Sequence, residues 1–596
     1  MKSRAPPAPG AKPHAWFQYV VLGKGITCTM LWAKSEVPIS DNHTNNDNRL
    51  MLTSFLNTCL SWIEMNREGE IPLYQITRNR HEINRCQRFA TTLCWNFRTR
   101  LAILIVLKNH QSHLITIKEN HMQRREYRPP GLQPWGFRGM FSAILIIGVM
   151  LMVMNLQADA QTQVSFEQYT LDNGLTVILH EDHSAPVAAV VAMYNVGSKN
   201  EKKGRTGFAH LFEHMMFQGS KHVADDEHFK LLQEVGGNIN GTTSNDRTNY
   251  FEVVPSNYLE LALYLESDRM GFLLPAMTQE KLDNQRDVVK NERRQNVDNQ
   301  PYGTAWEKIA KAIYPEEHPY SWPVIGYMED LSAATLEDVM EFFRIYYAPN
   351  NAVLSIAGDF KPAQAKEWVK KYFGSIPRGT EIPRPSPMPV TLSEEKRLVF
   401  EDKVQLPRLY LRWPSAPINT REDAVLDVIA DILGAGKNSR LYKTLVYDRQ
   451  VAQSVNVFQA SQMLSSQFSI EVTAKPGKSL TEMETVVNEE LANFFKEGVT
   501  EKEIQTSINH READLTNSLA TVLGKANSLA TYYIFTGDPN SINKEFDRYK
   551  GITPAEVLAV ARKVLGSNKV ALSIVPEGKA ELAAEKKTLE RKGGVE

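Results

Sequence analysis

The sequence is poor in cysteine and has no long apolar run, and these two absences exclude several classes of protein. Only 4 of its 596 residues are cysteines, and all of them precede residue 100 (Cys28, Cys59, Cys86 and Cys94). A fold held together by disulfides is therefore excluded for everything after residue 100. No apolar stretch reaches the roughly 20 residues that a membrane-spanning helix needs. We therefore expect no stable membrane span.

The chain as a whole also lacks excess charge, although its parts do not. The net charge is −1 at pH 7, but residues 1–160 carry 19 Lys and Arg against 10 Asp and Glu, which leaves residues 161–596 with a net charge of −10. Nucleic acids and anionic membrane surfaces are bound by basic protein surfaces. An acidic body of this size argues against both as the main partner, and we expect no nucleic acid partner.

The first 160 residues fall into two parts. Residues 1–121 have no lasting helix or strand period, and we assign them no fold. Residues 122–160 have the parts of a secretory signal, namely a basic region, an apolar core of about 14 residues and a small-residue site (Arg124, Arg125, Arg128 and Arg138; Met140 to Met154; Ala158-Asp159-Ala160). We therefore expect an exported, periplasmic protein whose mature form begins near Gln161.

Two alternatives to this interpretation remain open. A signal belongs at an N-terminus, so residues 1–121 either lie outside the natural product, with Met122 or Met140 as the start, or form a true extension. The signal could also stay uncleaved and anchor the protein in the membrane.

From residue 165 onward, strand and helix patterns alternate. Strands are predicted at 166–180, with a turn at 172–174, and at 187–196, 248–254 and 352–357; helices are predicted at 206–218, 226–235, 256–271, 278–296, 304–313, 335–346 and 362–373. Elements interleaved in this way call for a sheet covered by helices.

A proline-rich segment at residues 377–390 divides this part of the chain. Five prolines within 13 residues predict an extended, stiff linker between residues 165–376 and 391–580. Beyond it, predicted strands at 396–402, 408–413 and 467–473 and helices at 421–434 and 438–448 repeat the order of the first part. We predict an α+β fold of two homologous domains, each a mixed β-sheet covered by helices, followed by a charged, solvated tail at 581–596.

One predicted helix carries chemistry on its polar face. His210, Glu213 and His214 lie on the side opposite Phe208, Leu211, Phe212, Met215 and Met216 when the residues are placed at 100° intervals. Two histidines at i and i+4 can bind one Zn²⁺, and the intervening glutamate can take a proton from a water whose pKa the metal lowers. The alternative is an exposed polar face that holds these residues by chance.

Catalytic zinc usually has three protein ligands, so a third must come from elsewhere in the chain. The helix at 278–296 offers Glu292, which we place on the same buried stripe as Leu282, Val288 and Val289. An inward carboxylate is costly unless it is paired or bound to metal. A buried salt bridge with Arg293 or Arg294 is the alternative.

These residues resemble the pitrilysin/insulinase family of zinc metallopeptidases, in its short-chain branch similar to mitochondrial processing peptidase. The likeness rests on His210-Leu211-Phe212-Glu213-His214, on Glu292 placed 78 positions later, and on the segments 236–242, 299–303 and 347–351. It implies one Zn²⁺ per chain on His210, His214 and Glu292, with Glu213 as the general base. It also implies an edge strand at Asn240, Gly241 and Thr242 that binds the substrate backbone.

The sequence departs from the family pattern at two places. Many members carry a second glutamate where this chain has Gln285, and long-chain members supply an arginine and a tyrosine where it has Val446 and Gln453. The resemblance therefore implies a heterodimer with a homologous subunit that supplies the missing arginine and tyrosine. A homodimer is the second choice.

We expect a zinc-dependent endopeptidase that cleaves extended or unfolded peptides. Two alternatives stay open: a non-catalytic assembly or partner subunit of the same fold, and a periplasmic peptide-binding protein with a structural metal. A structural zinc usually has four protein ligands, and only three are found in the sequence.

Overall fold

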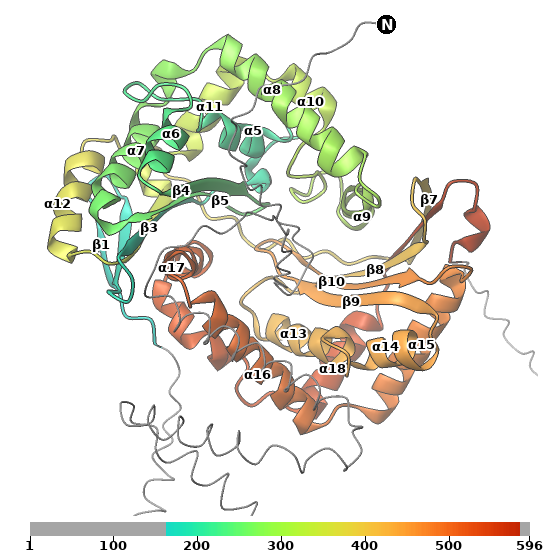
Figure 1. Ribbon diagram of the computed structural model, residues 1–596. Helices are drawn as coiled ribbons and strands as arrows, with labels where there is room; N and C mark the ends of the chain where they lie inside the picture. Colours follow the sequence, from blue (N-terminus) through green and yellow to red (C-terminus); the bar gives the residue numbers. More distant parts are fainter. Residues whose placement is uncertain (1–162, 585–596) are drawn as a thin grey trace, which may run out of the picture. The chain divides into compact units, whose positions relative to one another are not determined.

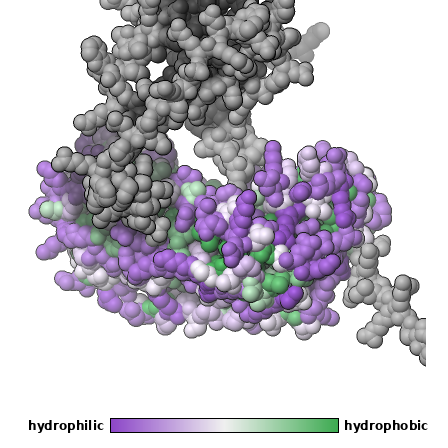
Figure 2. All heavy atoms as spheres, turned by 90° about the horizontal axis from the view of Figure 1, so that it is seen from below, coloured by the Kyte–Doolittle hydropathy of each residue, from purple (hydrophilic) through white to green (hydrophobic). Residues whose placement is uncertain are grey.

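The computed structural model describes residues 163–584. Residues 1–121, the predicted signal at 122–160 and the end of the predicted tail lie outside the described residues. Within them, no helix is both long and apolar enough to cross a membrane. Hydrophilic residues cover most of the face drawn in Figure 2, and apolar residues form small groups between them.

Two mixed β-sheets organise the described residues (Figure 1). The first sheet has the strand order β1-β2-β6-β3-β5-β4, and the second has the order β7-β11-β8-β10-β9. The strands of the first sheet are β1 (Glu167–Thr170), β2 (Thr176–Glu181), β3 (Val187–Tyr194), β4 (Asn238–Thr243), β5 (Thr248–Pro255) and β6 (Ala352–Gly358). Those of the second are β7 (Lys396–Asp402), β8 (Arg408–Ser415), β9 (Ala452–Ala460), β10 (Ser466–Ala474) and β11 (Val570–Pro576).

Apart from β1, the two sheets repeat one topology. In each, the first strand of the shared order pairs in parallel with its neighbour, β2 with β6 and β7 with β11, and all other pairs are antiparallel. The predicted strands 248–254 and 467–473 both lie next to an outer strand, as a duplication requires. The predicted fold class, mixed sheets covered by helices, is confirmed. We call residues 163–376 the first domain and residues 391–584 the second domain.

Helices account for most of the remaining chain. In the first domain they are α5 (Phe208–Met215), α6 (Glu227–Glu234), α7 (Leu259–Phe272), α8 (Gln279–Arg293), α9 (Ala305–Ile313), α10 (Met328–Ala333), α11 (Leu336–Tyr346) and α12 (Pro362–Phe373). In the second they are α13 (Arg421–Gly434), α14 (Arg440–Tyr442), α15 (Leu480–Glu497), α16 (Glu501–Ser518), α17 (Val522–Thr536) and α18 (Pro554–Leu565).

One helix of each domain packs against the sheet of the other domain. On one face of the first sheet, α17 of the second domain lies against β3 (Figure 1). Val191 and Met193 of β3 pack there against Leu529 of α17. On one face of the second sheet, β11 packs against Ile309 of α9, from the first domain. Strands buried on both faces are apolar along their whole length, as β3 is. The two domains therefore cannot separate without exposing both sheets.

Several details differ from the predictions. Val288 is 40% exposed, so it does not belong to the buried stripe of α8, which instead contains Leu282, Gln285 and Val289. The predicted helix 278–296 is α-helical only to Arg293 and continues as a π-helix over Arg294–Asp298. Similarly, the predicted helix 438–448 is the short α14 followed by a π-helix over Lys443–Asp448.

The prediction of a solvated tail from residue 581 onward is also wrong at its start. Ala583 and Ala584 are buried and pack into the core of the second domain, because the chain turns back after β11 over Ala580–Leu582. Residues 377–390 contain no helix or strand, as a linker should, but they are anchored. Arg384 donates a hydrogen bond to the carbonyl of Ile534, and the Met388 amide donates one to Leu464.

Candidate metal and peptide site

Helix α5 is held at its N-terminus by a buried carboxylate. Glu201 accepts hydrogen bonds from the backbone amides of Gly207 (3.0 Å) and Ala209 (2.8 Å), which have no partner inside the helix. Gly207 has φ +83°, and a Cβ there would lie 2.7 Å from the carbonyl oxygen of Ile325. A glycine is required at this turn. The start of the helix is thus fixed before its first polar residue.

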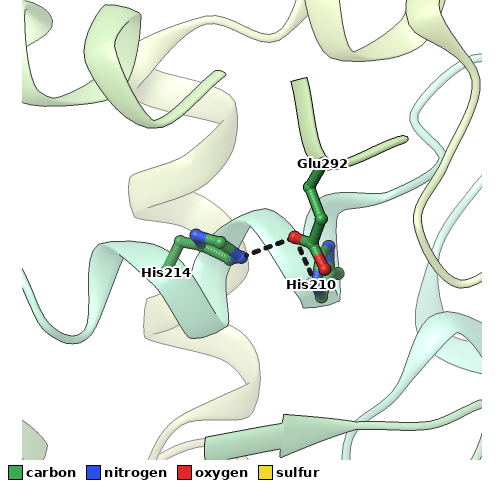
Figure 3. Close-up of side chains that lie close together, drawn as sticks. All are labelled: His210, His214 and Glu292. Carbon is green, nitrogen blue, oxygen red and sulfur yellow. Dashed lines mark ion pairs between the residues drawn. The ribbon is translucent and has the colours of Figure 1, made fainter. Parts of the chain in front are cut away.

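The polar face of α5 meets the last turn of α8. His210 Nε2 lies 3.6 Å from Glu292 Oε2, and His214 Nε2 lies 3.3 Å from the same oxygen. Figure 3 shows both imidazoles on one side of α5, with the Glu292 side chain reaching toward them. The three ligand atoms all lie within 4.8 Å of one another. The structure therefore brings together the three residues that the sequence predicts as metal ligands.

This arrangement fits a zinc ion. Ligand atoms that bind tetrahedral zinc at about 2.0–2.1 Å lie about 3.3 Å apart, close to the two separations observed here. Among residues 163–584, no other group of three His, Cys, Asp or Glu side chains has this proximity. The donor set of two imidazoles and a carboxylate is one that catalytic zinc sites use.

The protonation states suit metal binding. Burial lowers the pKa of His210 to about 4, with a smaller contribution from His214. A hydrogen bond from His214 holds the pKa of Glu292 below its usual value. At neutral pH His210 is neutral and Glu292 is ionised, and these are the forms that coordinate metals. His210 Nδ1 is buried without a hydrogen-bond partner in the described structure, so no neighbouring acceptor fixes its tautomer.

Glu292 is positioned by the residue that follows it. Arg293 is buried and donates hydrogen bonds to the carbonyl of Gly326 (2.8 Å) and to Glu307 on α9 (2.9 Å). These bonds hold the end of α8 against the loop before α10. The guanidinium therefore pairs with Glu307, and the alternative of a salt bridge between Arg293 and Glu292 is not what the structure shows.

The Glu213 side chain extends from α5 toward strand β4. Its Oε2 accepts a hydrogen bond of 2.5 Å from the hydroxyl of Thr243. Burial raises the pKa of Glu213, while the Thr243 bond and the charges of His214 and Arg247 act against that rise. A Cβ on Gly241 would lie 3.2 Å from Glu213 Cγ, so only a glycine lets β4 come this close without displacing the glutamate.

Among the strands of residues 163–584, β4 forms one edge of the first sheet and pairs only with β5. The Ser244 amide donates to the Arg247 carbonyl at the turn (2.9 Å), and hydrogen-bonded pairs alternate along an antiparallel ladder. By this alternation Ile239, Gly241 and Thr243 direct their backbone groups away from β5, toward the open edge. The edge thus presents backbone groups beside Glu213 that pair with no strand in the described residues, and the Gly241 amide donates to Asn240 Oδ1 (2.9 Å).

The predicted substrate residues Asn240, Gly241 and Thr242 have different surroundings on this strand. Asn240 is exposed, Gly241 lies against Glu213, and the Thr242 carbonyl accepts a hydrogen bond of 3.0 Å from Arg247. The sequence reasoning missed Thr243. The strand period of two was the available signal, since residues 241 and 243 must face the same side.

The residues that depart from the family pattern are also placed. Gln285 is buried on α8. Val446 packs against the core of the second domain, and Gln453 is exposed near the start of edge strand β9. Neither Val446 nor Gln453 has the positive charge or the phenolic hydroxyl that an arginine or a tyrosine supplies at a reaction centre.

Two family models match this architecture. Residues 176–321 match the model described as insulinase (peptidase family M16), and residues 333–510 match the one described as peptidase M16 inactive domain. Together they match more than half of the chain. The chain belongs to the insulinase family, peptidase family M16. The second model's description does not itself bear on the residues of α5 and α8, which lie outside its range.

Relatives and solved structures agree with this assignment. The chain is 29% identical over 402 residues to the Helicobacter pylori zinc protease PqqE (66% of this chain, 90% of that protein) and 23% identical over 415 residues to the Bacillus subtilis uncharacterized zinc protease YmxG (69% and 98%). A crystal structure of a protease from Helicobacter pylori has a TM-score of 0.64 at 27% identity, covering 69% of this chain and 99% of that one. The Escherichia coli periplasmic protease PqqL, at TM-score 0.59 and 17% identity, shares the fold over 71% of this chain and 49% of its own.

Proposed function

We propose that the chain is a zinc-dependent endopeptidase that cleaves extended or unfolded peptides. One observation carries the proposal: the ligand atoms of His210, His214 and Glu292 converge within 4.8 Å, and the helix that carries the two histidines also carries Glu213. The zinc protease relatives support it. A half-buried glutamate with no chemistry to perform would be an unfavourable residue to place beside such a cluster.

The residues of this chain have distinct parts in the proposed reaction. Zinc held by His210, His214 and Glu292 would polarise the scissile carbonyl and lower the pKa of the attacking water. Glu213 takes the proton from that water and then gives it to the leaving amine. Burial raises the pKa of Glu213 in the direction of neutral pH, which suits a group that must both accept and return a proton.

Substrate is proposed to bind as an added strand on β4. The outward backbone groups of Ile239, Gly241 and Thr243 would pair with an extended peptide, beside Glu213. Main-chain pairing demands an extended conformation and little side-chain selectivity. Unfolded polypeptide is therefore the expected substrate class.

The test compares three variants of the full chain. Glu213→Gln should keep one zinc per chain and lose cleavage of an unfolded reporter protein by at least about a hundredfold, because general base catalysis contributes roughly 10²–10⁴. His210→Ala should lose both metal and cleavage, and Asp431→Asn on α13 should lose neither. Wild-type turnover by Glu213→Gln would refute the mechanism.

We further propose that the working enzyme is a pair of homologous subunits in the periplasm. Val446 and Gln453 leave this chain without the arginine and tyrosine that the family resemblance implies, and PqqL matches it over only about half of its own length. A homologous chain that carries both residues would complete the site. Co-purification from the native host, with activity gained on mixing, is the expected result. Full activity of a dilute monomer would exclude the pair.

A second candidate is a non-catalytic partner subunit, favoured by the match of residues 333–510 to the inactive-domain model and by Gln453. The same zinc measurement separates the two, because a partner subunit has no need of a metal at His210 and His214.

A further inference from the structure

The β4–β5 hairpin connects the second domain to Glu213. The hairpin comprises β4, the turn Ser244–Arg247 and β5. Its first strand ends at Thr243, against the glutamate, and its turn contacts the loop between β9 and β10 of the second domain. These two contacts are only three residues apart along the chain, at Thr243 and Asp246.

The contact with Glu213 fixes an orientation as well as a position. Thr243 donates to Oε2 at 2.5 Å, which leaves Oε1 free for another hydrogen bond. Gly241 on the same strand lies directly against the Glu213 stem. Gly241 thus limits the position of the Glu213 stem, and the Thr243 hydroxyl fixes the orientation of the carboxylate. Any shift of β4 moves both contacts together.

The turn itself is closed by side-chain hydrogen bonds. The Ser244 hydroxyl accepts from the amides of Asp246 (3.2 Å) and Arg247 (3.1 Å), in addition to the backbone pair between Ser244 and Arg247. A serine that bonds to amides two and three residues ahead rigidifies a turn. A displacement of Asp246 is therefore transmitted to Thr243 rather than absorbed between them.

Buried polar groups of both domains hold this turn, Tyr320 from the first domain and the Gln462–Met463 segment from the second. Asp246 is 4% exposed, and its carboxylate accepts hydrogen bonds from the Tyr320 hydroxyl (2.6 Å) and from the backbone amide of Met463 (3.1 Å). Gln462 of the same second-domain loop donates to Asn245 Oδ1 (2.9 Å). The Tyr320 hydroxyl in turn accepts from the Leu464 amide (3.0 Å).

Burial makes this docking specific. The Lys199 side chain is also buried, and its ammonium donates to the Asp246 carbonyl and lies 3.9 Å from the Asp246 carboxylate. A buried charge that loses its partner is strongly destabilising, so the turn has one favourable position. The Ser198 and Lys199 amides of the first domain also hold the turn, through the carbonyls of Ser244 and Asn245, and the β9–β10 loop adds the bonds from Gln462 and Met463.

We propose that Thr243 is a positioning residue for Glu213, and that the second domain sets the place of Thr243 through Asp246. The inference rests on the proposed peptidase function for its kinetic consequence, but not for its structural one. It gives the domain without metal ligands a direct part in the reaction of the other domain.

The first experiment measures kinetics on Thr243 variants of the full chain, together with its partner subunit if one is required. Thr243→Val keeps the side-chain shape and removes the hydroxyl, and kcat should fall about 10–100-fold, the effect of losing a hydrogen bond to a charged group. KM and zinc content should stay within about twofold. Thr243→Ser should restore kcat to within a few-fold of wild type. Thr506→Val, which removes a hydroxyl bonded within exposed α16, is the matched control.

The second experiment is a double-mutant cycle between the turn and the threonine. Asp246→Asn should lower kcat in the wild-type background and add little in Thr243→Val, since its effect passes through the lost bond. Gln462→Ala serves instead if Asp246→Asn does not fold. Equal factors in both backgrounds would show that the turn does not act through Thr243.

A crystal structure of Thr243→Val separates this inference from the proposed function. We expect the Glu213 carboxylate to leave its place or to occupy more than one, while Thr243→Ser keeps it as in the wild type. An unchanged, single Glu213 conformation in Thr243→Val would overturn the inference, whether or not the protein is active. An inactive wild type with a displaced Glu213 in the variant would instead refute only the peptidase function.

Discussion

Two pairs of helices hold corresponding places in the two domains, but their facing polar residues differ: one pair brings together possible metal ligands, and the other forms ion pairs. Helices α5 and α13 are the first α-helices after β3 and β8, and α8 and α16 are the second after β5 and β10. In the first domain this helix pair brings together two histidines and Glu292. In the second, Arg511 of α16 pairs with Asp427 (3.2 Å) and Asp431 (3.0 Å) of α13.

The difference teaches what makes a buried polar face available to a metal. In the second domain three carboxylates of α13 are paired with arginines, since Asp427 and Asp431 share Arg511 and Arg548 lies 3.0 Å from Asp423. In the first, Glu292 pairs with no lysine or arginine in the described part of the chain. The same backbone plan thus forms a closed ion-pair network in one domain and an open ligand set in the other.

The largest expected effect is the loss of the metal. Glu292→Ala should lower the zinc content from about one per chain to near none, because two histidines alone bind zinc weakly. Asp431→Ala in the second domain should leave the zinc content unchanged. Metal analysis after dialysis measures both. Equal loss in the two variants would mean that the helix pairs do not differ as the comparison states.

The next effect concerns stability. Arg511→Met should lower the free energy of unfolding by about 2–4 kcal/mol, because it removes the positive charge that Asp427 and Asp431 share and leaves Asp431 with only the Ser507 hydroxyl as a partner. Glu292→Gln, measured with a chelator present, should change it by less than about 1 kcal/mol, since Glu292 pairs with histidines and with no lysine or arginine in the described part of the chain. Urea unfolding of both variants tests this. A larger cost for Glu292→Gln would make the first-domain cluster structural.

The domains should also respond to pH with opposite sign. Burial lowers the pKa of His228 on α6 to about 3, so below pH 6.5 the unfolded state binds a proton that the folded state does not, and stability falls with falling pH. His228→Leu should therefore recover about 2–3 kcal/mol at pH 4.5 relative to pH 7.5. Unfolding of both proteins at the two pH values measures this difference.

Asp427 supplies the contrasting case in the second domain. Burial raises its pKa to about 6, so between about pH 4 and pH 6 the folded state binds the additional proton and stability falls as pH rises. Asp427→Asn should remove that fall. If both variants shifted the pH dependence in the same direction, the assignment of buried base and buried acid would be wrong.

The smallest expected effect is at Gly241. A Cβ there would lie 3.2 Å from each of three atoms, on Glu213, Phe217 and Tyr250. Gly241→Ala should therefore cost about 1 kcal/mol of stability and lower kcat about 3–10-fold as Glu213 is displaced. Melting temperature and steady-state kinetics report the two effects. Unchanged kinetics would show that β4 and α5 can accommodate a Cβ at residue 241 without displacing Glu213.

Much of the site followed from sequence periodicity alone. His210 and His214 share a face because a helix repeats every 3.6 residues, and Glu213 accompanies them for the same reason. The apolar residues of α5 are buried as predicted. The buried stripe predicted for α8 is wrong at Val288, which is exposed, and at Glu292, whose side chain is 34% exposed. Glu292 still reaches His210 and His214, on the side of α8 where Val289 is buried.

The sequence by itself determined the alternation of strands and helices, the polar face of α5 and the repeat of one domain plan, because each is encoded in residues close together in the chain. Only the tertiary structure decided the rest. It placed Thr243 on Glu213, Glu201 on the start of α5 and Asp246 against the second domain. It also packed α9 of the first domain against the second sheet and α17 of the second domain against the first sheet. These contacts join residues on different elements, and their partners are chosen by packing and by the need to satisfy buried polar groups, which no local pattern records.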